Sequence, residues 1–121
     1  MTIKKMSNYQ VVTNSGEVFY YDNVYDSSEG LTKVEKNGKW GFINQLGELI
    51  CKMEYDQVYN FYNGFAEVKK DGKWGFIDKS GELICNIEYS TVFSFENGVA
   101  RVFKDNKQFL MNRKGETLLV C

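Results

Sequence analysis

The stretch Lys39–Ile43, KWGFI in one-letter code, decides the fold because the chain contains it twice. It returns unchanged at Lys73–Ile77, and the numbers of the two tryptophans give the period as 74 − 40 = 34. A fixed period of a few tens of residues indicates an array of small structural units, each of which buries its apolar surface against its neighbours. We therefore interpret the chain as a tandem array.

The likeness extends over the whole period. Residues 31–64 and 65–98 agree at positions spread along their full length, which one short motif would not produce. Outside the opening stretch, the identical pairs are Val34/Val68, Lys36/Lys70, Gly38/Gly72, Gly47–Cys51 over Gly81–Cys85, Glu54-Tyr55 over Glu88-Tyr89, Val58/Val92, Phe61/Phe95 and Asn63-Gly64 over Asn97-Gly98. These two segments are therefore interpreted as full repeats within a single domain, residues 1–121.

The two end segments are incomplete copies. In residues 99–121 the Trp-Gly pair is replaced by Gln108-Phe109. In residues 1–30 a shift of 31 places Tyr9 at the position of Trp40, so this copy is three residues short (34 − 31). Terminal units of arrays are atypical because their outer sides face water. We expect a degenerate N-terminal unit and a degenerate C-terminal cap.

Composition limits the classes of partner. The abundance of Phe (9) and Tyr (8) is typical of a folded chain and not of a disordered one. The net charge is −1, with 15 basic and 16 acidic residues interleaved, so no basic patch predicts a nucleic-acid partner. No apolar run reaches the roughly 18 residues that a membrane span requires. We expect neither nucleic acid nor membrane as a partner.

The N-terminus and the cysteines suggest a compartment. The segment Met1–Asn8 carries positive charge but no apolar stretch follows it, unlike a signal peptide. The three cysteines are then expected to stay reduced, as in the cytoplasm. We predict a cytoplasmic protein.

Each central copy predicts a three-stranded antiparallel meander. Thr32–Lys36 and Lys39–Asn44 flank Asn37-Gly38, a dipeptide typical of the two-residue type I′ turn because both residues tolerate positive φ. A second turn through Gly47 leads into a predicted third strand, Glu48–Cys51. The next copy repeats this pattern, with its third strand at Glu82–Cys85.

A two-residue turn also determines which residues face each other. Glu35 should lie opposite Trp40, and Val34 opposite Gly41. Both faces of such a hairpin carry apolar side chains, so we expect neighbouring units to cover them. Glycine within a strand often marks a close approach, so Gly41 and Gly75 are predicted to make room for the adjoining unit while the tryptophans fill the seams. The predicted repeat core is Trp40, Gly41, Phe42, Trp74, Gly75 and Phe76.

The other segments complete an all-β prediction. Residues 1–8 are expected to be a weakly held lead-in, followed by strands at Tyr9–Thr13 and Glu17–Tyr21 and a polar connection at Asp26–Gly30. The connection Tyr55–Gly64 has apolar residues every third position, which suits a short strand or bend. No stretch has helical periodicity. We predict a tandem array of antiparallel meanders stacked as an open solenoid, or alternatively an array curled into a barrel-like sheet.

These residues resemble the WG repeat family, which is named for its Trp-Gly pair. The matching positions are Phe61, Gly64, Ala66, Val68, Asp71-Gly72, Lys73–Asp78, Gly81, Leu83-Ile84 and Tyr89, and the resemblance covers residues 30–105. Many members carry proline after the aliphatic strand, whereas this chain has none and holds Cys51–Met53 and Cys85–Ile87 there. The resemblance implies a chiefly bacterial family built of β-hairpins, with binding as the presumed function.

No combination of residues predicts catalysis. The chain has no histidine, no Gly-x-Ser-x-Gly motif and no glycine-rich phosphate loop. Glu48, Glu82 and Glu116 recur at one position of every unit, whereas an acid–base pair needs two carboxyl groups in different environments. We expect no enzyme and no catalytic residue.

The cysteines and tryptophans each have two interpretations. Zinc sites take four ligands at close spacing, whereas Cys51 and Cys85 are a full period apart, so we expect buried cysteines, no metal and no cofactor. The tryptophans could form a stacking platform for a ligand. Their identical repeat positions favour packing.

The predicted function is a non-enzymatic protein–protein interaction module. It would be either an immunity-type protein, which neutralises a bacterial toxin, or an adaptor. The copies differ most in the connections between them, where we predict that the partner is contacted by Tyr59, Tyr62, Phe93 and Glu96. One alternative is self-assembly, with a homodimer through the weakly charged C-terminal edge Glu116–Cys121. Another is a small-molecule or glycan-binding module that uses aromatic side chains.

Overall fold

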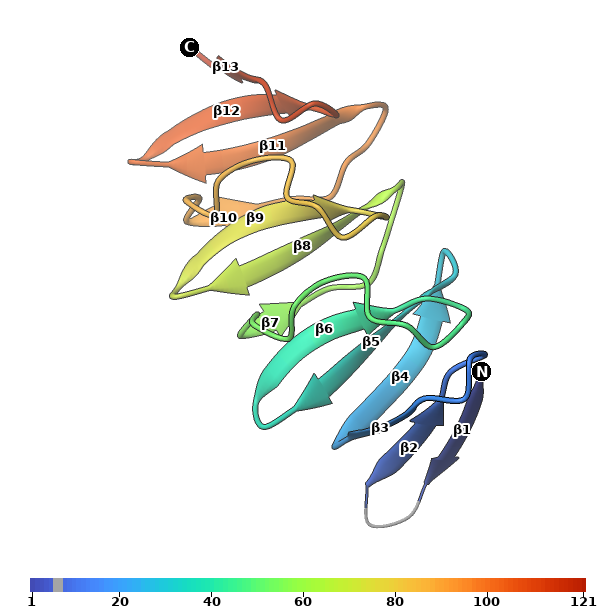
Figure 1. Ribbon diagram of the computed structural model, residues 1–121. Coiled ribbons are helices and arrows are strands. Elements are labelled where there is room, and N and C mark those ends of the chain that lie inside the picture. The colour runs from blue at the N-terminus through green and yellow to red at the C-terminus, as the bar shows by residue number, and fades with distance from the viewer. Residues whose placement is uncertain (6–7) are drawn as a thin grey trace.

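The computed structural model describes residues 1–5 and 8–121, and all of the described secondary structure is β (Figure 1). The strands are β1 (Thr2–Lys5), β2 (Tyr9–Val12), β3 (Val18–Tyr21), β4 (Asn23–Ser28), β5 (Leu31–Lys36), β6 (Lys39–Ile43), β7 (Gln57–Val58), β8 (Phe65–Lys70), β9 (Lys73–Asp78), β10 (Thr91–Val92), β11 (Val99–Lys104), β12 (Lys107–Asn112) and β13 (Thr117–Leu119).

These strands form four antiparallel sheets that follow one another along the chain. Their strand orders are β1-β2-β3, β4-β5-β6, β7-β8-β9 and β10-β11-β12-β13, and we name them rungs 1 to 4. The rungs lie one above another, with the two termini at opposite ends of the stack (Figure 1). The predicted all-β tandem array is therefore confirmed in its open form, because the described strands make separate sheets and not one curled sheet.

The central hairpins have the predicted register. Glu35 lies opposite Trp40, and Val34 opposite Gly41. The pairing of β8 with β9 repeats this arrangement one period later. The backbone of Asn37-Gly38 has φ angles of 53° and 76°, as a type I′ turn requires. Turn chemistry alone thus determined which residues share a face.

The third strand of each central sheet differs from the prediction. We expected Glu48–Cys51 to complete the meander, but this segment makes only one bridge, between Ile43 and Leu49. The third strand instead comes from the chain before the hairpin: β4 pairs with β5, and β7 pairs with β8. The segment after the hairpin leaves the sheet at residues 51–54 and returns at Tyr55, which bridges Trp40.

We call residues 51–54, and their counterparts 85–88 in rung 3, the excursions. Each excursion lies over the strand glycine of its own rung. A Cβ atom on Gly41 would come within 2.5 Å of the Met53 sulfur, and one on Gly75 within 3.1 Å of Ile87 Cγ1. The prediction that these glycines make room for the adjoining unit was therefore wrong, because the space is taken by the same repeat.

Buried side chains from facing rungs meet in clusters. Rungs 1 and 2 share Val11, Tyr21, Val34 and Ile43. Rungs 2 and 3 share Leu31, Phe42, Tyr55, Val58, Phe61, Ala66, Val68 and Ile77. Rungs 3 and 4 share Phe65, Phe76, Tyr89, Phe95, Ala100, Val102 and Met111. Neighbouring units thus cover each other's apolar faces as predicted, and each fully buried phenylalanine contributes about 1.5–3 kcal/mol of transfer free energy.

Phenylalanines fill the buried centre of these seams, whereas Trp40, which we predicted there, packs against the cluster of rungs 2 and 3 and stays partly exposed. Phe42 packs against Phe61, with ring centroids 4.7 Å apart, and both are buried. Trp40 is only half-buried. Its position explains this, because Trp40 is two residues beyond the Asn37-Gly38 turn, near the end of the rung, whereas Phe42 lies in the middle.

Two predictions for the N-terminal part were also wrong. Thr2–Lys5 is not a loose lead-in but pairs with β2, where Ile3 lies opposite Val11; residues 6 and 7 of that predicted segment lie outside the described residues. The polar connection predicted at Asp26–Gly30 is mostly strand, since β4 continues to Ser28. The chain then turns at Glu29-Gly30, both with positive φ, so a second tight turn takes the place of a loop.

Candidate binding surface

Three exposed rings recur at the same position of successive rungs. Tyr25, Tyr59 and Phe93 are spaced by one period, and 40%, 46% and 43% of their surface is exposed. The Tyr59 amide donates to the Glu67 carbonyl, and the Phe93 amide donates to the Arg101 carbonyl in the same way. The regular backbone therefore presents the rings as one aligned set, which we call the aromatic row.

Two rings of the aromatic row stack on the indole of their own rung. Tyr25 lies on Trp40 with ring centroids 5.2 Å apart, and Tyr59 lies on Trp74 at 5.3 Å with only 9° between the planes. Rung 4 has no tryptophan, and Phe93 instead meets Phe103 edge-on at 5.9 Å. Such ring pairs hold an exposed aromatic side chain in one orientation.

Each ring of the row has a cation over it or over the ring on which it stacks. The Lys33 Nζ atom is 5.2 Å from the Tyr25 ring centroid, and the Arg101 guanidinium carbon is 4.5 Å from that of Phe93. Lys69 lies over the indole on which Tyr59 stacks. Within residues 1–5 and 8–121, none of these cations forms a salt bridge. Aromatic and cationic groups therefore alternate along this side of the stack.

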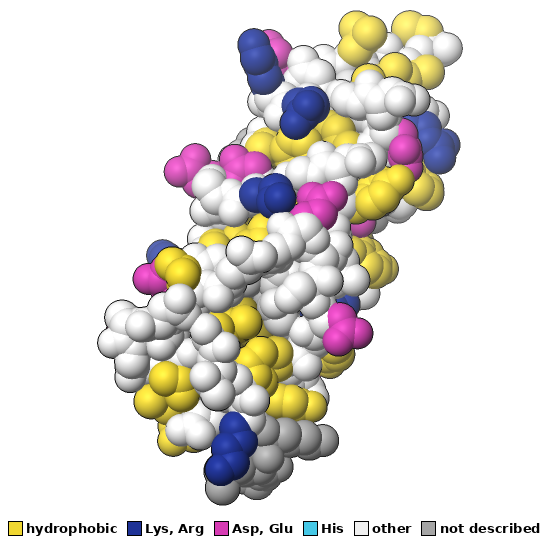
Figure 2. Space-filling model, turned by 90° about the vertical axis from the view of Figure 1, so that its right-hand side faces the viewer, with side chains coloured by type: hydrophobic (Ala, Val, Ile, Leu, Met, Phe, Trp, Pro, Cys, Tyr) yellow, Lys and Arg dark blue, Asp and Glu magenta, His cyan; other side chains and the backbone are white. Residues whose placement is uncertain are grey.

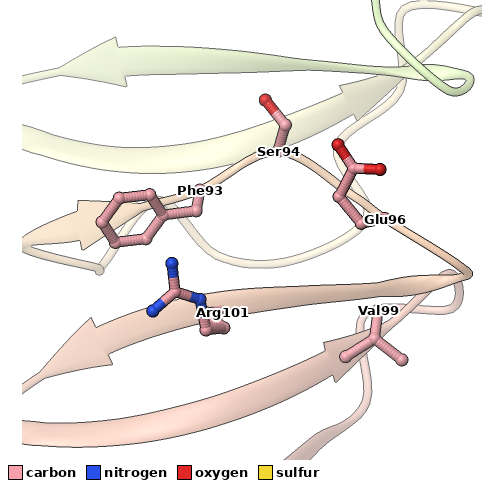
Figure 3. A pocket seen from close by; sticks show the side chains of 5 residues that line it. All are labelled: Phe93, Ser94, Glu96, Val99 and Arg101. Atoms are coloured by element: carbon pink, nitrogen blue, oxygen red, sulfur yellow. The ribbon is translucent and has the colours of Figure 1, made fainter.

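A hollow of about 490 Å³ lies at the C-terminal end of the aromatic row. Figure 3 shows Phe93 and Arg101 side by side at one end, with Glu96 and Val99 toward the other end. Ser94 also lines the hollow. It therefore combines an aromatic face, one cation and one carboxylate, a mixture suited to a protein side chain or loop.

The four residues predicted to contact a partner fall into two groups. Phe93 and Glu96 line the same hollow. The Tyr62 hydroxyl donates to Glu96 Oε1 at 3.1 Å, and this hydrogen bond raises the pKa of Tyr62. Tyr59 belongs to the rung before, on its indole. All four side chains are exposed.

Sequence reasoning missed Tyr25 and the cations of the aromatic row. The signal for Tyr25 was present, since 25, 59 and 93 differ by one period. The degenerate first unit concealed it, because its own repeat shift is three residues shorter. Arg101 gave no signal, because the equivalent residues Lys33 and Glu67 carry opposite charges.

The thiols of the two repeat cysteines lie in apolar surroundings. Burial raises the pKa of the Cys51 and Cys85 thiols, which disfavours the nucleophilic thiolate. These two cysteines are half-buried and Cys121 is exposed, and all three are free. Among the described residues, no group of Cys, Asp and Glu is arranged to hold a metal ion. The arrangement offers contact chemistry: stacking, cations and hydrogen bonds.

Stacked sheets with one recurring hairpin define an all-β tandem-repeat protein. The model of the family described as WG containing repeat matches residues 19–40, 40–74 and 74–107, which together span more than half of the chain. The chain belongs to this family. No curated protein and no solved structure matches it. In the described part of the chain, nothing helical is long and apolar enough to cross a membrane.

Proposed function

We propose that this chain is a non-enzymatic repeat module that binds another protein through the aromatic row and the adjoining hollow. The observation that supports the proposal is the recurrence, on three successive rungs, of an exposed ring that packs on a second ring and has a cation over one of the two. Exposed tyrosines and arginines are the residues that most often dominate protein interfaces. Sheets that pack face to face are about 10 Å apart, so three rungs present a surface long enough for a protein partner.

The geometry favours a protein over a small molecule or glycan. A sugar could stack on the covered indole faces only by displacing Tyr25 from Trp40 or Tyr59 from Trp74. Figure 2 shows apolar, basic and acidic side chains interspersed on another side of the stack, so charges of both signs are available beyond the row. An immunity-type protein and an adaptor are two forms of the proposal. The three free cysteines support a reducing, cytoplasmic setting for either.

Affinity capture with matched variants tests the proposal. The chain is immobilised beside a double variant of the row, Tyr59→Ser with Phe93→Ser. A control pair, Leu46→Ser with Leu83→Ser, removes equally exposed apolar side chains away from the row. A true partner in host lysate is retained by the parent and by the control, and lost by the row variant. Quantitative mass spectrometry measures the three retentions.

The identified partner is then purified and titrated by calorimetry. We expect the row variant to bind at least about tenfold more weakly than the parent, because a lost hot-spot ring costs more than about 1.4 kcal/mol. If no protein distinguishes the row variant from the control, binding through this surface is refuted.

A further inference from the structure

One aspartate position recurs beside the hairpin turns of successive rungs. In rung 2 the Asn37 amide donates to Asp22 Oδ2 at 2.8 Å, and in rung 3 the Asp71 amide donates to Asp56 Oδ2 at 2.9 Å. In both rungs a carboxylate accepts the hydrogen bond of the first turn residue. Hydrogen bonds to an ionised group are roughly twice as strong as neutral ones. The central rungs therefore contain a carboxylate site that the chain itself fills.

In rung 3 this carboxylate has a second donor, which comes from the rung before. Lys39 donates to Asp56 Oδ1 and forms a salt bridge with it. The antiparallel bridge between Trp40 and Tyr55 places Lys39 opposite Asp56. The hydrogen bonds from Lys39 and from the Asp71 amide lower the pKa of Asp56. This position thus favours an ionised carboxylate.

Rung 4 keeps the backbone of the site but has serine in place of the aspartate. The Ser90 amide donates to the Phe103 carbonyl at 2.9 Å, as the Asp56 amide donates to its own hairpin at 2.8 Å. The turn of rung 4 begins at Asp105 with a φ of 54°, against 53° at Asp71 in rung 3. The Asp105 amide therefore lies toward Ser90 as the Asp71 amide lies toward Asp56.

The donors of rung 4 have no carboxylate of the chain to receive them. Lys73 lies opposite Ser90, because the antiparallel bridge that follows it repeats that of rung 2. In the part of the chain that the structure describes, Lys73 forms no salt bridge and the Asp105 amide has no acceptor. The Ser90 hydroxyl instead donates to the Phe103 carbonyl at 3.1 Å. The Asp105 carboxyl does not exclude an acidic group, because Asp71 has the same place in rung 3.

A hollow of about 460 Å³ adjoins these donors at the end of the aromatic row. Ser90 and Thr91 line it together with Asn106 of the turn, and the rings of Phe93 and Phe103 are its apolar part. Phe93 also lines the hollow described above, so the two hollows share one exposed ring of the row. A protein that covers Phe93 can therefore reach the donors of rung 4.

We propose that Lys73 and the Asp105 amide bind an aspartate or glutamate side chain of the protein partner, whose carboxylate takes the position that Asp56 has in rung 3. This inference rests on the protein-binding function proposed above and adds a charged anchor to it. Two donors on one carboxylate determine its direction as well as its sign. A neutral side chain would leave the charge of Lys73 without a counter-charge, so the site selects an acidic residue.

An NMR titration of the full chain tests the site without a partner. The probe is N-acetylaspartate N-methylamide, whose one charge is a side-chain carboxylate. We expect the Asp105 amide proton to move downfield and to saturate, whereas the Asp71 amide, which Asp56 already binds, should stay in place. Sodium chloride at equal ionic strength is the control. An Asp105 amide that does not move, or that moves as far with chloride, overturns the proposal.

Two substitutions exchange the properties of rungs 3 and 4. Ser90→Asp supplies the carboxylate from the chain, so the Asp105 amide should move downfield without the probe and no longer respond to it. Asp56→Ser removes the carboxylate from rung 3, so the Asp71 amide should become responsive. Both positions are exposed, and we expect both variants to fold, which their amide spectra verify. If either amide behaves as in the parent, the two sites are not equivalent and the proposal fails.

Binding of the captured partner separates this inference from the function on which it rests. Ser90→Asp should weaken partner binding about tenfold in calorimetry, because its carboxylate occupies the donors and repels that of the partner. Ser90→Asn has a similar size but no charge, and it should weaken binding by less than about threefold. If the row variant loses the partner while Ser90→Asp binds as the parent does, the acidic anchor alone is refuted. A partner that binds the row variant normally refutes the protein-binding function instead.

Discussion

The central rungs and the end rungs differ in how the chain returns to the hairpin. In rung 2, Trp40 bridges Tyr55, and in rung 3, Trp74 bridges Tyr89 one full period later, so the two returns are equally long. In rung 1, Tyr9 pairs instead with Tyr21. In rung 4, the Val120 amide donates to the Gln108 carbonyl. Both of these end returns are three residues shorter, so both end rungs lack the extra residues of the excursion.

The central and end rungs also differ in the residue that lies next to the excursion or at the equivalent position. The central rungs have Gly41 and Gly75 there, and the end rungs have Gln10 and Phe109. Where the excursion exists, it occupies the space of a side chain. Where it is missing, an unbroken third strand follows and a side chain is tolerated, as when Phe109 lies opposite Leu119. The glycine and the three extra residues are therefore one structural feature.

The excursion also determines how tightly the next rung docks. A Cβ atom on Gly81, in the turn of rung 3, would lie 1.9 Å from the carbonyl oxygen of Ile50, the residue just before the rung 2 excursion. Gly115 meets Ile84 in the same way. Gly47 faces rung 1, which has no excursion, and its nearest atom would be 3.2 Å away. At this turn glycine the central rungs approach the following rung more closely than rung 1 does, and rung 1 contacts rung 2 through the hydrogen bond from the Asn14 amide to the Leu46 carbonyl.

The largest expected effect is that of Gly81→Ala. The new methyl group would overlap the Ile50 carbonyl, and the φ of +88° is unfavourable for alanine. We expect a loss of about 4 kcal/mol in the free energy of unfolding, measured by urea denaturation. The control Gly72→Ala has a φ of +81° but no atom within 4 Å, so it should cost only about 1–2 kcal/mol. Equal losses would contradict the close contact between rungs.

Replacing the central-rung glycine by the end-rung phenylalanine, or the reverse, should lower the free energy of unfolding. Gly75→Phe would force Ile87 away, since even a Cβ atom lies 3.3 Å from its Cα. Phe109→Gly would leave a gap that no excursion fills. We expect each variant to lose roughly 2–3 kcal/mol in thermal or chemical unfolding. The control is Gly75→Ala, for which Ile87 needs to move only slightly. If Gly75→Phe were as stable as Gly75→Ala, the glycine and the excursion would not be one structural feature.

The central and end rungs also differ at one charged position. Glu67 in rung 3 is only 8% exposed, and burial raises its pKa from the ordinary value of 4.5 to about 7. Arg101 at the same position of rung 4 is exposed. Because the folded protein holds this proton more tightly than the unfolded chain, stability should fall as pH rises from about 4.5 to 7.

Glu67→Gln removes that titration. We expect the variant to be about 2–3 kcal/mol more stable than the parent at pH 8 and to differ little from it at pH 4. Denaturant titrations at the two pH values measure this difference. The control Glu82→Gln makes the same substitution at an exposed carboxyl group in the turn of the same rung, and an equal gain in stability there would contradict the role of burial at Glu67. If stability varied with pH in Glu67→Gln as it does in the parent, ionisation of the Glu67 carboxyl would not destabilise the folded protein.

The smallest expected effect concerns the aromatic row. Tyr59→Ala removes the ring that stacks on Trp74 and should cost about 1 kcal/mol in unfolding free energy. The Trp74 fluorescence should also shift to longer wavelength, because the indole becomes more exposed. Tyr62→Ala, whose hydroxyl contacts the exposed Glu96, is the control and should change neither quantity by much. An unchanged emission in Tyr59→Ala would contradict the stacked arrangement.

Sequence reasoning was most accurate where local chemistry decides the geometry. The Asn37-Gly38 and Asp71-Gly72 turns determine the pairing of their hairpins, and the register of both was predicted correctly. It was least accurate after Gly47, where the chain leaves the sheet. That path depends on the space above Gly41, which no pattern within the segment itself records. The missing proline in this segment marked a departure from the family pattern without indicating its course.

The candidate surface was predicted in part for a similar reason. Exposure of Tyr59, Tyr62 and Phe93 agrees with their place in the variable connections, although their role in binding remains a prediction. Tyr25 and Arg101 became part of the surface only when the strand that precedes each hairpin was placed. Tyr25 stacks on Trp40 and Arg101 lies beside Phe93 within one rung, and the pairing of β4 and β10 with these hairpins was not predicted.

The sequence by itself determined the period, because identical residues recur 34 positions apart. It also determined the turns, the register and the all-β class, because these follow from residues that are adjacent or joined by a two-residue turn. The tertiary structure alone decided which strand completes each sheet and which side chains fill the seams. Those outcomes depend on the competition of neighbouring rungs for the same space, and only the folded stack resolves that competition.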